Sequence, residues 1–314
     1  MHVAHPQKGW FVKNPAQGTW ALILAGGDGM RLRPLTRQIA GDERPKQFCP
    51  LLDGETLLDR TRRRVDLLVR PDRQVVVVSQ PHEQYYRELA GDLAPGRLAV
   101  QPSNRGTAAG MLCGLVRIAS LAGPVPVAVF PCDHYISDDR AFGRSVEHAL
   151  GLVHARRDLV VVLGIEPTHA ETQYGWIEPG GECARASDGA VAFAVRRFWE
   201  KPARAQAQML LRSGALWNSF VMVGWVDAFV ALVAEALPGL VAAFAPVWRA
   251  GTSTHETTVL RQIYHRIPAV GFSDAVLARV PDRLAALRAT GFTWTDLGDP
   301  QRTLAYLDLP LGAA

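Results

Sequence analysis

Cysteine is scarce in this sequence. The four cysteines, Cys49, Cys113, Cys132 and Cys183, form no C-x-x-C pair and have no partners at metal-ligand spacing. The pattern therefore predicts neither a disulfide framework nor a structural zinc site. Reduced thiols are typical of cytoplasmic proteins, so we expect a cytoplasmic protein.

Lysine is equally scarce, with only four lysines among 34 basic residues, and the formal net charge is +4. No run of basic residues is long enough to predict a nucleic-acid tract, and we expect no nucleic-acid partner. The densest arginine cluster, residues 60–64, is interpreted as the solvated side of an amphipathic helix. Two of the few lysines, Lys46 and Lys201, lie in motifs described below.

Long apolar runs are also missing. The most apolar region, residues 221–248, is interrupted by Asp227 and Glu235 on one helical face and then broken by Pro238. We predict two buried amphipathic helices there, because a membrane span needs about 20 uninterrupted apolar residues. Residues 1–19 lack an apolar run of signal-peptide length and are interpreted as an N-terminal extension. We expect no membrane partner.

Short apolar strands alternate with helical patterns in the first half of the chain. Strands that are apolar throughout are typical of a parallel sheet covered on both faces. The predicted strands are Trp20–Ala25, Gln74–Ser79, Arg97–Gln101, Val127–Pro131 and Leu159–Gly164, and the predicted helices are Thr107–Ala122 and Asp139–Arg156. This alternation predicts an α/β fold with a doubly wound, mostly parallel, Rossmann-like sheet that binds ligands at the carboxyl ends of its strands.

A glycine-rich loop follows the first predicted strand. Gly26, Gly27 and Gly29 would let the backbone approach a ligand closely, and Arg31 adds a donor fork suited to phosphate. The loop has no lysine and so is no P-loop, and Leu32 occupies the third glycine position of the dinucleotide fingerprint. From the glycines alone, a tight turn and a phosphate site are equally open.

The longer sequence string decides between these alternatives. Residues 26–36, followed by Arg-Pro-Lys-Gln-Phe at 44–48, resemble the signature of the sugar-1-phosphate nucleotidyltransferases, and the Pro-Lys-Gln-Phe segment is similar to that of the mannose-1-phosphate guanylyltransferases. The resemblance implies an enzyme of the nucleotide-diphospho-sugar transferase fold. Its expected partners are GTP and mannose 1-phosphate, and its expected products are a nucleotide-sugar and pyrophosphate. Arg31 and Lys46 would be catalytic residues that hold the triphosphate.

Two aspartates in family-like motifs predict a metal site. Asp133 follows the fourth predicted strand in Phe-Pro-Cys-Asp-His, and Asp296 lies in Trp-Thr-Asp-Leu-Gly. The resemblance implies that both bind Mg2+, an ion that takes one or two protein carboxylates and completes its shell with phosphate oxygens and water. Asp299 is expected to cap the helix that begins near Pro300. His134 is expected to be structural.

Three further motifs resemble the family's sugar-binding segments. Glu-Thr-Gln-Tyr-Gly-Trp at 171–176 implies that Tyr174 and Gly175 bind the sugar. In Phe-Trp-Glu-Lys-Pro at 198–202, the resemblance implies a sugar contact for Glu200 and a catalytic phosphate contact for Lys201. Trp-Asn-Ser at 217–219 implies that Asn218 binds the sugar. Phe220 stands where the family has glycine.

The segment at 101–110 occupies the position that recognises the base in the family. Gln101, Gly106 and Thr107 are therefore expected to bind the nucleotide, together with the glycines of the first loop. The sequence Gln-Pro-Ser-Asn-Arg-Gly-Thr-Ala departs from the guanylyltransferase form, which is nearer Arg-Asn-Thr-Ala-Pro-Ala. A heptose guanylyltransferase, a thymidylyl- or uridylyltransferase, and a non-catalytic sensor of nucleotide-sugars remain alternatives.

The pattern changes near residue 165, where Gly, Pro and aromatic residues become frequent, strands are predicted to be antiparallel, and helices cluster between 203 and 265. We predict one domain over residues 20–314, with a nucleotide-binding half at about 20–165 and a sugar-phosphate-binding half, inserted as a subregion, at 166–314. A homodimer is the expected assembly.

Overall fold

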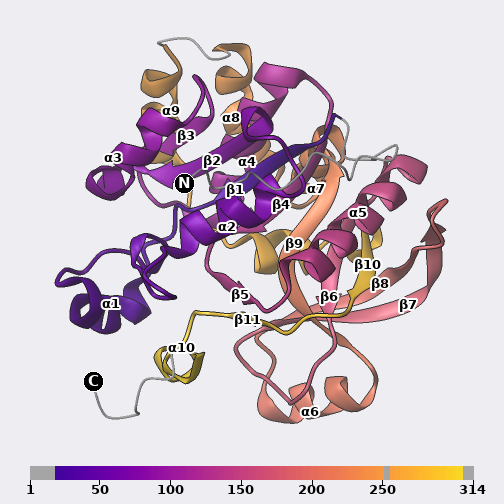
Figure 1. The fold of residues 1–314 in the computed structure, drawn as a ribbon. Helices are drawn as coiled ribbons and strands as arrows, with labels where there is room; N and C mark the ends of the chain where they lie inside the picture. The colour runs from indigo at the N-terminus through magenta and orange to yellow at the C-terminus, as the bar shows by residue number, and fades with distance from the viewer. Residues whose placement is uncertain (1–17, 251–254, 307–314) are drawn as a thin grey trace, which may run out of the picture.

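The computed structural model describes residues 18–250 and 255–306. A nine-stranded sheet forms the centre of the molecule, in the order β3-β2-β1-β4-β9-β6-β10-β8-β7 (Figure 1). Its strands are β1 Trp20–Leu24, β2 Gln74–Ser79, β3 Leu98–Gln101, β4 Pro126–Pro131, β6 Val160–Ile165, β7 Gly175–Arg185, β8 Val191–Glu200, β9 Leu216–Trp225 and β10 Leu284–Ala289. Every strand except β8 and β9 runs in one direction. The predicted N-terminal extension lies almost entirely outside the described residues.

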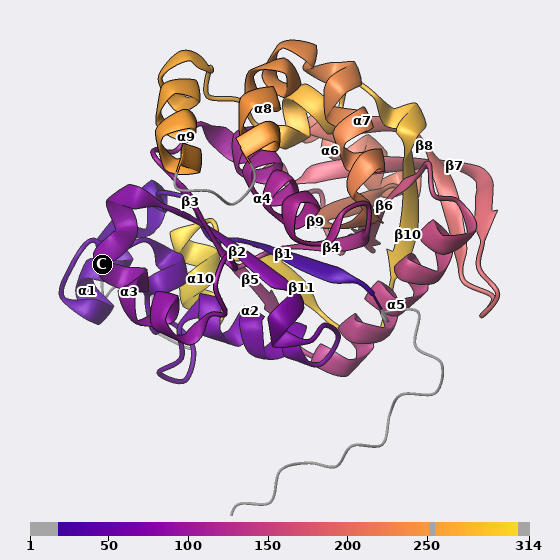
Figure 2. The ribbon, with the colours of Figure 1, turned by 90° about the horizontal axis from the view of Figure 1, so that it is seen from above.

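Helices cover both faces of this sheet, as the view from above shows (Figure 2). The helices are α1 Arg33–Ala40, α2 Leu57–Asp66, α3 Glu83–Asp92, α4 Gly106–Ala122, α5 Asp139–Ala155, α6 Arg204–Arg212, α7 Val226–Ala236, α8 Pro238–Ala250, α9 His255–Arg266 and α10 Pro300–Tyr306. Helices α4, α7, α8 and α9 lie over one face, and α2, α3 and α5 over the other. This arrangement confirms the prediction of a doubly wound α/β sheet.

The alternation of side chains along the central strand explains the two cores. Ala21 and Ile23 of β1 pack into the core beneath α2, α3 and α5. Trp20 and Leu22 point to the opposite face and pack into the core beneath α4, α7 and α8. A strand that is buried on both sides must be apolar at every position, which is the pattern the sequence shows.

The predicted strands and helices of the first half agree with the structure to within one residue at each end. Two expectations were wrong. Residues 221–225 are the end of strand β9, not helix, and only α7 and α8 follow. Arg64 is not on the solvated side of α2: it is 2% exposed, and its Nε donates to Asp139 Oδ1 at 2.6 Å.

The register of the central strands places two loops together. Leu24 at the end of β1 pairs with Pro131 at the end of the parallel strand β4, so the glycine-rich loop and Asp133 leave the sheet side by side. A small second sheet follows, in which β5 (His134–Ile136) pairs with β11 (Trp294–Asp296). Within the described ranges, no helix combines the length and apolar character needed to cross a membrane.

Candidate active site

A cavity of about 460 Å³ opens at the carboxyl ends of the parallel strands. It brings together most of the residues that the sequence predicts for the site. They are Gly26, Gly27, Arg31, Gln101, Gly106, Thr107, Asp133, Tyr174, Gly175, Glu200, Lys201, Asn218 and Asp296. Gly29 and Lys46 line an adjoining cavity of about 260 Å³, which shares Gly27, Arg31 and Asp133 with the first.

The loop after β1 is held by contacts with the segment that follows α1. Gly29 adopts a φ of +59°, and a Cβ there would lie 3.0 Å from the backbone nitrogen of Lys46, so glycine meets both requirements. Gln47 Nε2 donates to the carbonyls of Ala25 at 2.9 Å and Gly27 at 2.7 Å. The two segments of the phosphate-binding motif are thus fixed against one another.

Lys46 forms an ion pair at the base of the site. Its Nζ lies 2.9 Å from Asp133 Oδ2 and donates to the carbonyl of Leu297 at 2.8 Å. The side chain is only 12% exposed. Burial would raise the pKa of Asp133, but the charge of Lys46 outweighs it and lowers that pKa to about 2. Asp133 is therefore ionised at any physiological pH.

His134 is fixed in one orientation beside this pair. Trp294 Nε1 donates to His134 Nδ1 at 3.2 Å, so Nδ1 carries no proton and Nε2 faces Asp133 Oδ1 at 3.6 Å. Burial lowers the pKa of His134 below its ordinary value, which keeps the ring neutral. A neutral ring held by its neighbours is consistent with the structural role expected for it.

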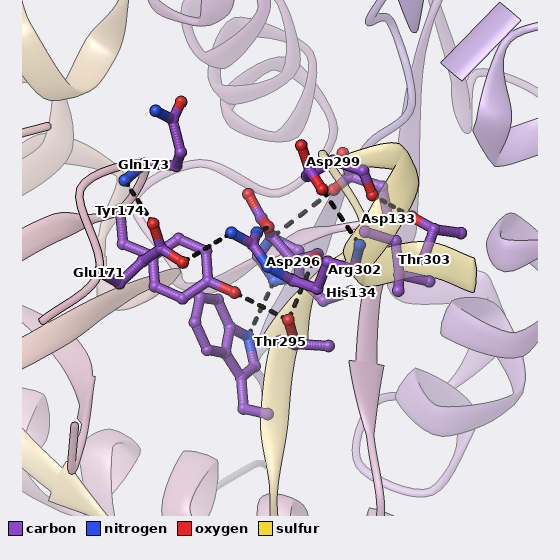
Figure 3. Close-up of polar contacts among 12 residues, drawn as sticks. Asp133, His134, Glu171, Gln173, Tyr174, Thr295, Asp296, Asp299, Arg302 and Thr303 are labelled. Carbon is purple, nitrogen blue, oxygen red and sulfur yellow. Dashed lines mark hydrogen bonds and ion pairs between the residues drawn. The ribbon is translucent and has the colours of Figure 1, made fainter. Parts of the chain in front are cut away.

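Asp296 is paired with an arginine that the sequence did not single out (Figure 3). One Nη of Arg302 donates to Asp296, and Arg302 Nη2 donates to Glu171 Oε2 at 2.8 Å. The guanidinium also lies over the ring of Tyr174, 4.6 Å from its centroid. Asp299 accepts from the backbone of Arg302 at 3.1 Å, which confirms that it caps α10.

The two aspartates suit a magnesium ion. Asp133 and Asp296 line the same cavity, and the carbonyl of Asp133 accepts from the backbone of Leu297 at 3.2 Å. A Cβ at Gly298 would lie 2.9 Å from Asp296 Oδ2, so glycine leaves this oxygen uncovered. Among the residues that the structure describes, no group of three or more His, Cys, Asp or Glu is placed to hold a metal. Two carboxylates are enough for Mg2+ when phosphate oxygens complete the shell.

The opposite side of the cavity carries the predicted sugar-binding residues. A Cβ at Gly175 would lie 2.8 Å from the ring of Phe198 and 2.9 Å from Glu200 Oε2, so glycine is needed for the close approach of β7 to β8. Burial raises the pKa of Glu200, and the nearby charge of Asp274 adds to the rise. Lys201 follows with a φ of +46°, and its Nζ lies 3.6 Å from Glu200 Oε1.

The loop before α4 closes the nucleotide side of the cavity. Gly106 has a φ of +80°, and a Cβ there would lie 2.2 Å from the carbonyl oxygen of Val270. Thr107 Oγ1 accepts from the backbone of Phe272 at 2.7 Å. The side chain of Gln101 is held by Tyr264, whose hydroxyl donates to Gln101 Oε1 at 3.0 Å.

The sequence analysis missed several residues of the cavity wall. These are Asn104, Gln173, Phe220, Phe272, Ser273 and Asp274. Phe272 to Asp274 come from a π-helix, Ser273–Leu277, and the residue before it, and π-helical turns are frequent at functional sites. No local pattern marks such a turn, whereas Asn104 and Gln173 lie inside motifs that could have drawn attention to them.

Comparison with known proteins shows the family. The sequence profile described as nucleotidyl transferase matches residues 20–307. The chain belongs to the nucleotidyl transferase family. Such a match spans almost the whole sheet and both sides of the cavity.

Relatives in this family share about 30% of their residues with the chain. Xanthan biosynthesis protein XanB of Xanthomonas campestris pv. campestris (strain B100) is 30% identical over 281 residues, which cover 88% of this chain and 57% of that protein. A mannose-1-phosphate guanylyltransferase of Sinorhizobium fredii (strain NBRC 101917 / NGR234) is 29% identical over 281 residues, covering 88% and 52%. The chain therefore spans a little over half of the length of these nucleotidyl transferase relatives.

Solved structures of the family share the fold. A crystal structure titled mannose-1-phosphate geranyltransferase, from Thermus thermophilus, is 33% identical, with a TM-score of 0.77 over 93% of this chain and 79% of that one. A UDP-glucose pyrophosphorylase complexed with UDP-glucose is 16% identical, with a TM-score of 0.56 over 92% of this chain and 97% of the other. The second likeness shows the fold alone.

Proposed function

We propose that this protein transfers a nucleotidyl group from an NTP to a sugar 1-phosphate and releases pyrophosphate. The observation that carries the proposal is the composition of one cavity. The glycine-rich loop and two aspartates form one side, and Glu200, Lys201 and Asn218 form the other. Such a cavity can hold two phosphorylated substrates with their reacting groups between its two sides.

The proposed reaction is an in-line displacement at phosphorus. An oxygen of the sugar phosphate forms a bond to the α-phosphorus of the NTP. The bond from that phosphorus to the oxygen bridging to the β-phosphorus breaks, and its electron pair leaves on pyrophosphate. The attacking oxygen is already anionic at neutral pH, so no general base is needed. Positioning and charge neutralisation supply the rate enhancement.

Basic side chains on both sides of the cavity neutralise the phosphates. Arg31 and Lys46, with the amides of the loop between them, hold the triphosphate in this proposal. Lys201 holds the incoming sugar phosphate. Asp133 and Asp296 would hold Mg2+, which when bound supplies positive charge beside the phosphate oxygens. Because Lys46 is paired with Asp133 at 2.9 Å, the triphosphate must share this ammonium with the carboxylate.

GTP and mannose 1-phosphate are the first substrate pair that we propose. Support comes from the relatives at about 30% identity, one of which is named a mannose-1-phosphate guanylyltransferase. Residues 101–110 depart from the guanylyltransferase form, so a uridylyl- or thymidylyltransferase is the alternative within the same reaction.

A pyrophosphate-release assay tests the function. Each of four NTPs is combined with mannose, glucose and heptose 1-phosphates in the presence of Mg2+, with a chelated sample as the control. Release with GTP and mannose 1-phosphate supports the full proposal. Release with another pair keeps the reaction and replaces the substrates. No release with any pair, together with binding of a nucleotide-sugar in calorimetry, would contradict catalysis and favour a sensor.

A further inference from the structure

Backbone strain is concentrated at the cavity. Three residues other than glycine have a positive φ among the residues that the structure describes: Asp53 at +52°, Lys201 at +46° and Phe220 at +57°. Asp53 lies in an exposed turn, but both of the others line the 460 Å³ cavity. A bulky aromatic residue in this region is an outlier, and such outliers cluster at functional sites.

The local structure fixes Phe220 in this conformation. The residue lies in a bulge of β9, where residues 219–221 stand opposite the single residue Leu163 of β6. Ser219 Oγ donates to the carbonyl of Leu163 at 2.7 Å, and the backbone N–H of Phe220 donates to Asn218 Oδ1 at 2.9 Å. The bulge therefore directs the side chain by several hydrogen bonds and not by packing alone.

Glycine would meet the backbone requirement without strain, because it adopts positive φ freely. The presence of phenylalanine therefore calls for a role of the side chain. Part of the ring packs edge-to-face on the fully buried Phe272, with 6.0 Å between centroids and 76° between planes. The rest borders the cavity, since Phe220 is only half-buried.

Polar groups suited to hydroxyls surround this apolar surface. Asn218 Oδ1 is engaged by the backbone of Phe220, so its amide NH2 is the group left to donate into the cavity. Glu200 and Asp274 line the same cavity and can accept from hydroxyls. An apolar surface with a few converging polar groups is the usual form of a site for a small ring-shaped ligand.

We propose that Phe220 is a specificity-determining residue whose ring covers one C–H face of the sugar ring. The proposal rests on the proposed function and names the selection at its sugar site. Asn218 and Glu200 bind hydroxyls at the edge of the sugar, while the phenyl ring excludes water from one face. A sugar with an axial hydroxyl on that face is rejected, because the hydroxyl would lose its water without gaining a partner.

The test compares Phe220→Gly with Asp53→Gly. Both changes relieve a positive φ, but Asp53 lies outside the cavity. Kinetics with the productive NTP should show that Phe220→Gly raises the KM for the sugar 1-phosphate about tenfold, with the KM for the NTP nearly unchanged. The ratio of kcat/KM between two epimeric sugar 1-phosphates should fall towards one. Asp53→Gly should leave every kinetic constant as in the wild type.

Binding measurements separate this inference from the proposed function. Calorimetric titration with mannose 1-phosphate and its glucose and heptose counterparts is made on the wild type and on Phe220→Gly. If the wild type binds none of them and turns over none, both proposals are overturned. If the wild type binds and the variant binds equally well with unchanged discrimination, only the role of Phe220 is overturned. Should Phe220→Gly not fold, Phe220→Asn, which also tolerates positive φ, takes its place with the same expected outcomes.

Discussion

Arg302 joins helix α10 to the loop that precedes β7 through an ion pair with Glu171. Arg302 Nη2 lies 2.8 Å from Glu171 Oε2, and the two side chains are 18% and 13% exposed (Figure 3). The same guanidinium binds Asp296 and covers Tyr174. One side chain therefore ties a predicted metal-binding aspartate to a predicted sugar-binding segment.

Arg302→Ala is expected to lower the free energy of unfolding by about 2 kcal/mol, because Glu171 is left buried without its charged partner. Urea denaturation measures the change. The matched control is Arg283→Ala, which removes an exposed pair with Glu235 at 2.9 Å and should cost less than about 0.5 kcal/mol. Equal losses in the two variants would contradict the role of Arg302.

The stability conferred by Glu171 should depend on pH. Burial would raise its pKa, but the hydrogen bond from the backbone of Gln173 and the charge of Arg302 together lower that pKa below its ordinary value of 4.5. A lowered pKa gives stability that is present above pH 4.5 and is lost as the pH falls through the folded-state value. The Tm of Glu171→Gln should lie below that of the wild type at neutral pH, and the gap should close as the pH falls through that folded-state value. A constant gap would argue against this linkage.

Gly106 is expected to tolerate no side chain. In Gly106→Ala a Cβ would meet the carbonyl oxygen of Val270 at 2.2 Å, whereas Gly189→Ala has nearly the same φ, +88° against +80°, and open space around it. Both variants carry the backbone strain of about 1 kcal/mol, but only the first must also move the loop. We expect a clearly larger loss of stability and a higher KM for the NTP in Gly106→Ala. Similar values for both glycines would show that the close approach has no consequence.

Asp133→Asn tests the metal assignment. The amide keeps the size of the side chain, so the fold should persist, while turnover should fall at least about a hundredfold. Binding of Mn2+ in the presence of the NTP, followed by electron paramagnetic resonance, should weaken in parallel. Asp299→Asn is the control, because asparagine also caps helices and Asp299 lies outside the proposed metal site. Wild-type metal binding in Asp133→Asn would exclude this aspartate as a ligand.

Sequence patterns predicted the sheet well where strands are buried on both faces. β2 was predicted at its observed bounds, Gln74–Ser79, because four successive valines between polar residues can form little else in a covered sheet. Residues 221–225 were misassigned because a short apolar run is equally compatible with a buried helix. The preceding residues of β9 carry the bulge, which no periodicity reveals.

Contacts between distant segments were beyond the reach of the sequence. Arg302 meets Glu171 across 131 positions, and nothing in either motif indicates the partner. Arg64 was interpreted as solvated because its helix is rich in arginine, yet Asp139 receives it from 75 positions away. The cavity residues in recognisable motifs were predicted, whereas those contributed by the π-helix, such as Asp274, came only from the structure.

The most direct test of the account follows the α-phosphorus of the nucleotide. The protein is incubated with Mg2+, sugar 1-phosphate and NTP labelled at the α-phosphate, and the labelled products are separated and identified by mass. The account predicts that the label moves into a nucleotide-sugar, with one equivalent of pyrophosphate released, and that Lys46→Gln slows this transfer by at least about a hundredfold. Label that remains in the NTP, or that appears in an NDP with release of inorganic phosphate, would contradict nucleotidyl transfer as the reaction of this site.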